Sequence, residues 1–209
     1  MNVPNRLTLL RLCLVPAFMS FMVVDNFWTR VSSLLIFAGA SLTDWYDGVI
    51  ARRTGTVTVV GTFLDPLVDK MLIAAALVGF VEMRELHIPA WMVVLIISRE
   101  FLITGLRSLA ASRGILMGAE RAGKFKTTSQ MVTIITILLI LILDSAIEHW
   151  PRLLDMIGMR GENFIWFLER SPYWLVFWVT ITTILSGYFY IRKHRDLLKK
   201  EFAMLKSRP

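Results

Sequence analysis

Residues 41–70 read SLTDWYDGVIARRTGTVTVVGTFLDPLVDK, and this stretch decides the fold. It joins two apolar segments, 31–52 and 58–81, through a short polar run that begins at Arg52. Each segment is long enough to cross a bilayer as a helix, which takes roughly 20 mostly apolar residues. Because a short connection makes consecutive helices antiparallel neighbours, we expect the two segments to lie side by side.

The composition of the whole chain agrees with a membrane protein. Hydrophobic residues make up 56% of the 209 residues, charged residues 19%, and the mean hydropathy is +0.60. Soluble domains contain about 45–50% apolar and about 25% charged residues. These values exclude a soluble globular domain and a disordered chain. The single cysteine, Cys13, excludes a disulfide scaffold.

The apolar stretches predict an all-α integral membrane protein with six transmembrane helices in one domain, residues 1–209. The candidate spans are 7–24, 31–52, 58–81, 88–110, 125–143 and 173–191. The first is the weakest, and residues 2–10 read as a short interfacial helix that leads into it. We expect 144–171 to form a long loop on the outer interface, and 192–209 to form a basic cytoplasmic tail.

The distribution of basic residues predicts the orientation. When the spans are taken alternately, most lysines and arginines fall on the side that holds both termini. The positive-inside rule places that side in the cytoplasm, so we expect a multi-pass protein of the inner or plasma membrane. Topology and anionic lipid headgroups explain the formal net charge of +7, and no nucleic-acid partner is needed.

Four aspartates lie within a few turns of the connection between the second and third spans. Asp44 and Asp47 share one helical face with Gly48, and Asp65 and Asp69 follow at a spacing of four on the next helix. Intramembrane carboxylates are costly and mark function by default. Four of them close together would repel, and one divalent cation or a pair of them, Mg²⁺ or Mn²⁺ with all-oxygen ligands, would remove that repulsion. The guanidinium group of Arg52 could donate two hydrogen bonds to phosphate oxygens.

Two other interpretations of the aspartates carry less weight. In the first, the aspartates only form ion pairs with cations inside the bundle, which are Arg52, Arg53, Lys70 and Arg99. In the second, the aspartates belong to a cation- or proton-coupled transporter. A pairing role does not call for four acids on two facing stripes. Transporter sites usually lie near the bilayer midplane on broken helices of repeated halves. These acids lie toward one end of their spans, and the sequence shows no repeat.

Written as a pattern, the stretch is Asp44-x2-Asp47-Gly48-x2-Ala51-Arg52-x8-Gly61-x3-Asp65-x3-Asp69. It resembles, at every specified position, the signature of the CDP-alcohol phosphatidyltransferases. That resemblance implies transfer of a phosphatidyl group from CDP-diacylglycerol to an alcohol with release of CMP. It also implies a six-helix membrane domain that forms a homodimer.

Further stretches resemble the bacterial phosphatidylglycerophosphate synthase branch, whose acceptor is sn-glycerol 3-phosphate. They are Asn2-Val-Pro-Asn-Arg-Leu-Thr-Leu-Leu-Arg11, Ser41-Leu-Thr-Asp-Trp-Tyr-Asp47, Gly61-Thr-Phe-Leu-Asp-Pro-Leu-Val-Asp-Lys70, Ser98-Arg-Glu100 and Gly123-Lys-Phe-Lys-Thr127. Inositol phosphate, serine and phosphatidylglycerol are the acceptors of other branches that share the acidic signature, and they remain alternatives.

The resemblance also implies residue roles. Asp44, Asp47 and Asp65 would hold one metal ion, and Asp44, Asp65 and Asp69 the second. Gly48 and Arg52 would receive the CDP portion of the lipid, with Thr58 as a contact to its diphosphate or ribose. Asp69 is the expected general base, which takes the proton from the attacking hydroxyl.

The acceptor carries its own phosphate, and we assign Arg107, Lys124 and Lys126 to it, because they lie at cytoplasmic span ends in stretches that resemble the branch. The alternative is that they only set the topology, which is our reading of Arg113 and Arg121. The run Ser98-Arg99-Glu100 reads either as a buried ion pair or as a wall of the acceptor site, and the sequence does not separate these.

Overall fold

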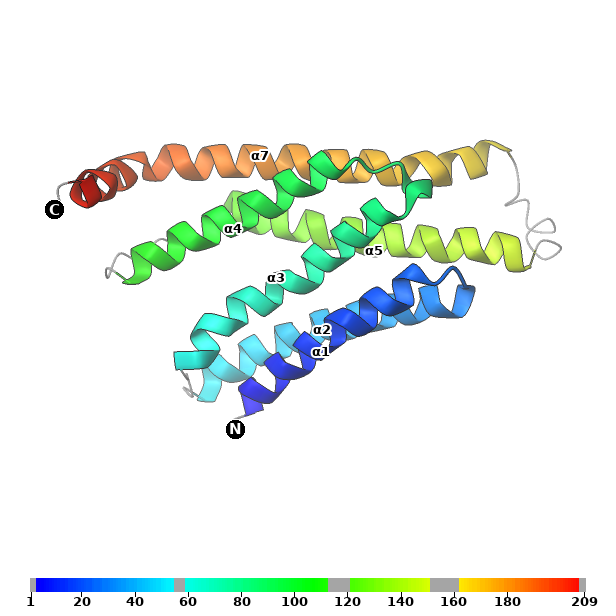
Figure 1. Ribbon diagram of the computed structural model, residues 1–209, viewed down its shortest axis with the longest axis horizontal. Coiled ribbons are helices and arrows are strands. Elements are labelled where there is room, and N and C mark those ends of the chain that lie inside the picture. The colour runs from blue at the N-terminus through cyan, green and yellow to red at the C-terminus, as the bar shows by residue number, and fades with distance from the viewer. Residues whose placement is uncertain (1–2, 55–58, 113–120, 151–161, 207–209) are drawn as a thin grey trace.

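A computed structural model describes residues 3–54, 59–112, 121–150 and 162–206, and within these ranges the regular structure is all helical. The helices are α1 (Val3–Val23), α2 (Phe27–Thr54), α3 (Val59–Glu82), α4 (Ala90–Ser112), α5 (Arg121–His149) and α7 (Glu162–Lys206), with a 3-10 helix, η1 (Arg84–Leu86), between α3 and α4. Successive helices run back and forth along a common direction, and both termini lie at the same end of the bundle (Figure 1).

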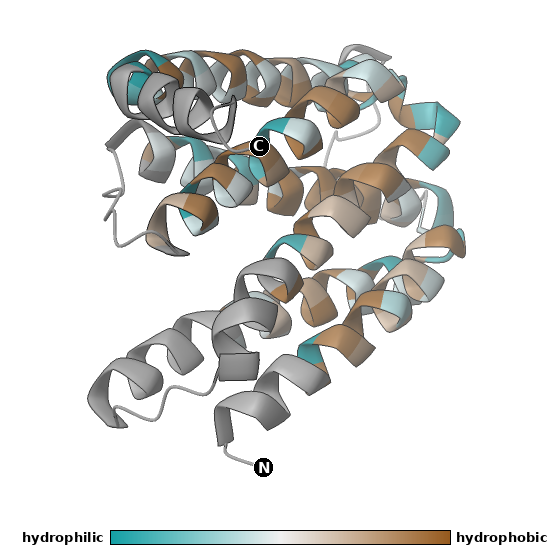
Figure 2. Ribbon diagram, turned by 60° about the vertical axis from the view of Figure 1, so that its left-hand side comes forward, coloured by the Kyte–Doolittle hydropathy of each residue, from teal (hydrophilic) through white to brown (hydrophobic). Residues whose placement is uncertain are grey.

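Each apolar stretch found in the sequence forms a helix, which confirms the all-α prediction. Hydrophobic residues run along much of the length of these helices (Figure 2). Within the described ranges, two helical segments are long and apolar enough by themselves to cross a membrane, Phe125–His149 and Phe164–Arg195. Leu10–Val23 is apolar over a shorter length.

The N-terminal segment differs from the expectation. Residues 3–23 form the single helix α1, so the expected interfacial helix over 2–10 is not a separate element. Pro4 lies in the first turn, where a missing N–H costs no helical hydrogen bond. Nothing between there and Pro16 breaks a helix, and Pro16 lies inside α1, where its carbonyl accepts a hydrogen bond from Ser20 Oγ at 2.9 Å.

The prediction of a loop over 144–171 is also wrong at both ends of this range. α5 continues to His149 and α7 begins at Glu162; residues 151–161 lie outside the described part. Ser145 and Leu168 are buried, so both extensions belong to the packed bundle. At the other end of α7, residues 192–206 continue the last helix without a break.

Arg30 ties together the end of the bundle opposite the termini. Its side chain is only 5% exposed, and Nη1 donates a 2.8 Å hydrogen bond to the carbonyl of Leu141 on α5. Its guanidinium also pairs with Asp25 at 2.6 Å, with Asp144 at 3.4 Å and with Glu85 at 3.7 Å. One side chain from α2 therefore joins the α1–α2 turn, η1 and α5.

Replacing Arg30 with methionine should lower the stability of the bundle by about 1.5–3 kcal/mol, the usual worth of a hydrogen bond to a charged group. Thermal unfolding of the purified protein in detergent measures this change. Arg84→Met is the matched control, because Arg84 is exposed on η1. Equal melting temperatures for the two variants would contradict the role given to Arg30.

Candidate functional site

The four aspartates fall on two helices whose ends meet. α2 ends at Thr54 and α3 begins at Val59, at the end of the bundle that holds both termini (Figure 1). Asp44 lies ten residues before the end of α2, and Asp69 lies ten residues after the start of α3. At 1.5 Å per residue, both lie about 15 Å along their helices from the connection. The backbone therefore places all four aspartates within about 15 Å, measured along α2 or α3, of the connection between these two helices. Over their described residues, both helices pack against α1.

Several predicted site residues fall outside what the structure describes. The side chains of Asp44, Asp47, Asp65, Asp69, Gly48, Arg52 and Lys124 lie on described helices but are not themselves described, and Thr58 lies outside the described residues. Among the described side chains, no group of three or more His, Cys, Asp or Glu residues is placed to hold a metal ion. The donor chemistry of the four aspartates still suits a hard divalent cation, because carboxylate oxygens are its preferred ligands.

A buried charge cluster links the three helices next to this segment. Glu100 on α4 pairs with Lys70 Nζ on α3 at 2.5 Å, and its other carboxylate oxygen pairs with Lys126 Nζ on α5. Lys126 is completely buried and also donates to Gln130 Oε1 at 2.5 Å. Lys70 follows Asp69 directly in the chain, so the cluster is attached to the aspartate-bearing helix. We call Glu100, Lys70 and Lys126 the three-helix clamp.

Arg99, the neighbour of Glu100, points to a different helix. Its Nη2 donates a 2.8 Å hydrogen bond to Ser186 Oγ on α7. Gly187 makes room for it, because a Cβ added at Gly187 would lie 3.3 Å from Arg99 Cγ. The open question about Ser98-Arg99-Glu100 is thus resolved in part: Glu100 forms an ion pair with two lysines, whereas Arg99 joins α4 to α7.

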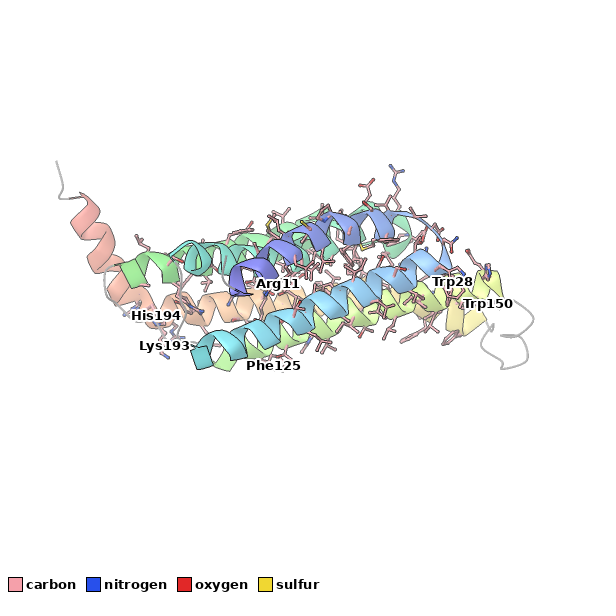
Figure 3. The ribbon with its side chains drawn as sticks, turned by 90° about the horizontal axis from the view of Figure 1, so that it is seen from below. Arg11, Trp28, Phe125, Trp150, Lys193 and His194 are labelled. Atoms are coloured by element: carbon pink, nitrogen blue, oxygen red, sulfur yellow. The ribbon has the colours of Figure 1, made fainter. Side chains whose placement is uncertain are left out.

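Arg107 lies further toward the same end of α4, where its guanidinium carbon is 6.0 Å from the ring centre of Tyr190. Tyr190 is buried, and its ring lies 4.6 Å from that of His194. Figure 3 shows His194 and Lys193 at the opposite end of the bundle from Trp28 and Trp150. The described cations Lys70, Arg99, Arg107 and Lys126 therefore gather on the side of the bundle where α4 meets α3, α5 and α7.

Sequence reasoning missed the residues that hold these cations. Gln130 lies four residues after Lys126, and Ser186, Tyr190 and His194 are spaced by four on α7. These spacings place each set on one helical face, which was a usable signal. The partner of Lys126, Glu100, belongs to another helix, and only the tertiary structure identifies it.

Replacing Gly187 with leucine should crowd Arg99 and lower the stability by about 1–3 kcal/mol, as overpacking does. Gly105→Leu is the control, because a Cβ added at Gly105 meets nothing within 4 Å. Thermal unfolding of both variants measures the difference. Equal melting temperatures for Gly187→Leu and Gly105→Leu would show that the packing of α4 against α7 does not need this close approach.

Comparison with known proteins points the same way as the aspartates. A family model described as CDP-alcohol phosphatidyltransferase matches residues 1–184. A Bacillus subtilis relative named CDP-diacylglycerol–glycerol-3-phosphate 3-phosphatidyltransferase is 36% identical over 212 residues, which covers 95% of this chain and 97% of the relative. Relatives of the same name from Escherichia coli and Salmonella typhimurium are each 40% identical over 139 residues, covering 64% of this chain and 74% of the relative.

Proposed function

The chain belongs to the CDP-alcohol phosphatidyltransferase family, and from that premise we infer that it moves the phosphatidyl group of CDP-diacylglycerol to sn-glycerol 3-phosphate. The products are phosphatidylglycerophosphate and CMP, so the protein is a membrane transferase of phospholipid biosynthesis. The observation that carries this conclusion is the Bacillus subtilis relative of that name, which aligns with 95% of the chain.

We propose that six helices, α1 to α5 and α7, cross the membrane and that the aspartate end faces the cytoplasm. The excess of basic residues on the side of both termini supports this orientation. The common end of the two termini in the bundle supports an even number of crossings (Figure 1). We also propose, from the family resemblance, that two copies associate in the membrane.

For the metal site, we propose that Asp44, Asp47, Asp65 and Asp69 hold two Mg²⁺ or Mn²⁺ ions. All four aspartates lie within ten residues of the end of α2 or the start of α3, and four carboxylates brought close together in an apolar environment would require compensation of their charge. When bound, two such ions would stabilise charge on the attacking and leaving oxygens of a phosphoryl transfer.

For the donor lipid, we propose that Gly48 leaves space for the CDP portion and that Arg52 and Thr58 contact its diphosphate or ribose. Asp69 takes the proton of the glycerol 1-hydroxyl. The hydroxyl oxygen then forms a bond to the lipid-linked β-phosphorus, and the bond from that phosphorus to the bridging oxygen breaks. CMP leaves with the electron pair. Positioning supplies most of the rate in this class of reaction.

For the acceptor phosphate, we propose Arg107, Lys124 and Lys126. Lys126 Nζ has three N–H donors. Two of them meet Glu100 and Gln130, which leaves the third for a phosphate oxygen. Arg107 lies on the same cation-rich side and is exposed at the end of α4. Three cations from α4 and α5 would match the double charge of the acceptor.

The function is tested by CMP release from purified protein in detergent with CDP-diacylglycerol and Mg²⁺. sn-Glycerol 3-phosphate, inositol phosphate, serine and phosphatidylglycerol are supplied in turn. We expect release with sn-glycerol 3-phosphate and only background release with the others. Release with another acceptor would keep the reaction class and overturn the acceptor; no release with any acceptor would overturn the function.

Asp69→Asn should lower turnover by at least about 100-fold, the usual contribution of a general base, while largely sparing CDP-lipid binding. Asp25→Asn is the matched control, since Asp25 is mostly exposed and belongs to the Arg30 contacts at the other end of the bundle. Turnover is followed by CMP release and binding by retention of labelled CDP-diacylglycerol. Undiminished turnover in Asp69→Asn would remove its assignment as the base.

Chelation with EDTA should reduce turnover to background, because the carboxylates then lack their counter-charge and the reacting oxygens their Lewis acid. Adding Mg²⁺ or Mn²⁺ in excess should restore it. Full turnover in a protein freed of divalent ions, checked by elemental analysis, would refute the metal proposal without touching the identity of the substrates.

A further inference from the structure

The three-helix clamp has a feature that the reaction described above does not use. A single carboxylate, Glu100 on α4, pairs with two ammonium groups that belong to α3 and α5. The side chains of Glu100 and Lys70 are 15% and 23% exposed, and that of Lys126 is fully buried. Each Glu100 oxygen pairs with a different lysine, so the loss of either contact would remove one of the ion pairs that link α4 to α3 and α5.

The surroundings make this pairing strong and costly to break. A small hollow beside the clamp is lined mainly by apolar side chains, among them Ile73, Ala74 and Leu77. Little water is therefore available to replace a lost partner. A buried ammonium without a counter-charge is strongly disfavoured, and Glu100 is the carboxylate that pairs with Lys126 among the described side chains.

The clamp also connects the two halves of the proposed site. Lys70 follows Asp69, the proposed base, and Lys126 lies two residues after Lys124 in the proposed acceptor segment. The ion pairs of Glu100 therefore link α3, which carries the proposed base, to α5, which carries the proposed acceptor lysines, and help to fix the position of one helix relative to the other. A misplacement of about 1 Å between reacting groups can cost about 100-fold in rate.

We propose that Glu100 is a positioning residue for the acceptor. It holds the Lys126 ammonium so that its remaining N–H points to the acceptor phosphate, and it fixes α5 against the Asp69 segment of α3. Glu100 itself touches no substrate and acts through Lys126. This inference rests on the proposed acceptor, sn-glycerol 3-phosphate.

The test compares Glu100→Gln with the wild-type protein and with Glu148→Gln, a control at an exposed position near the far end of α5. Steady-state CMP release gives KM separately for sn-glycerol 3-phosphate and for CDP-diacylglycerol. We expect Glu100→Gln to raise KM for the acceptor about 10- to 100-fold and to leave KM for the lipid within about twofold. Glu148→Gln should match the wild type, and Glu100→Asp, which keeps the charge, should fall between.

Glu100→Gln leaves the buried Lys126 amine without its carboxylate and this can prevent folding, so a second pair of variants, Lys126→Met and Glu100→Gln/Lys126→Met, removes that amine. If Glu100 acts through Lys126, the double variant should raise the acceptor KM no more than Lys126→Met alone. Effects that multiply in the double variant would show that Glu100 acts by another route and would overturn the proposal.

Three further results would also overturn it. They are an acceptor KM in Glu100→Asp equal to that of the wild type, an equal rise of KM for both substrates, and a lower acceptor KM in Glu100→Gln. The last result would mean that Glu100 competes with the acceptor phosphate for Lys126. A wild-type protein without CMP release would instead defeat the proposed function, so the two failures are distinct.

Discussion

Charge in an apolar bundle must be compensated, and the arrangement of this protein follows from that constraint. At one end, Arg30 is buried, and its two terminal nitrogens contact a carbonyl and three carboxylates. Toward the other end, Lys126 is buried and is held by Glu100 and Gln130. In both places the partners come from different helices, so each buried cation also fixes how the helices pack. Such pairs contribute more to a unique arrangement than to net stability, because desolvation offsets much of their attraction.

The same constraint distinguishes the functional end from the structural end. Arg30 has more acidic neighbours than it needs, and these are well exposed to solvent. The opposite end collects four aspartates on α2 and α3 and a set of cations on α4 and α5. In the proposed function, divalent cations would complete the first group and the phosphate of the acceptor would complete the second. The metal ions would then neutralise the aspartates, and the substrate phosphate would neutralise the cations. The three-helix clamp would keep these two groups at a fixed distance from each other.

Much of the fold was predictable from hydropathy alone. All six apolar stretches became helices, because an uninterrupted run of about 20 apolar residues has few other stable conformations in a membrane. Helix ends were predicted less well. Residues 144–149 and 162–171 carry enough polar side chains to read as a loop, yet Ser145 and Leu168 are buried by packing. Hydropathy does not register such contacts.

The candidate site, too, was predictable only in part: residues that lie close together in the sequence were identified, and contacts between distant helices were not. The eight specified positions from Asp44 to Asp69 were sufficient to identify the family, because they lie within one short stretch of the sequence. The clamp was not predictable, because Glu100 and Lys126 lie on different helices and their pairing depends on packing. Arg99 and Glu100 illustrate the limit: consecutive helical residues point about 100° apart, so one meets α7 and the other meets α3 and α5.

The central claim is that four carboxylates from two helices hold a pair of divalent cations. The most direct measurement is anomalous X-ray diffraction from crystals of the protein grown with Mn²⁺. We expect two anomalous peaks between α2 and α3, each in contact with the carboxylates of Asp44 and Asp65, with Asp47 on one ion and Asp69 on the other. Absence of peaks there, with the aspartates paired instead to Arg52 and Arg53, would contradict it.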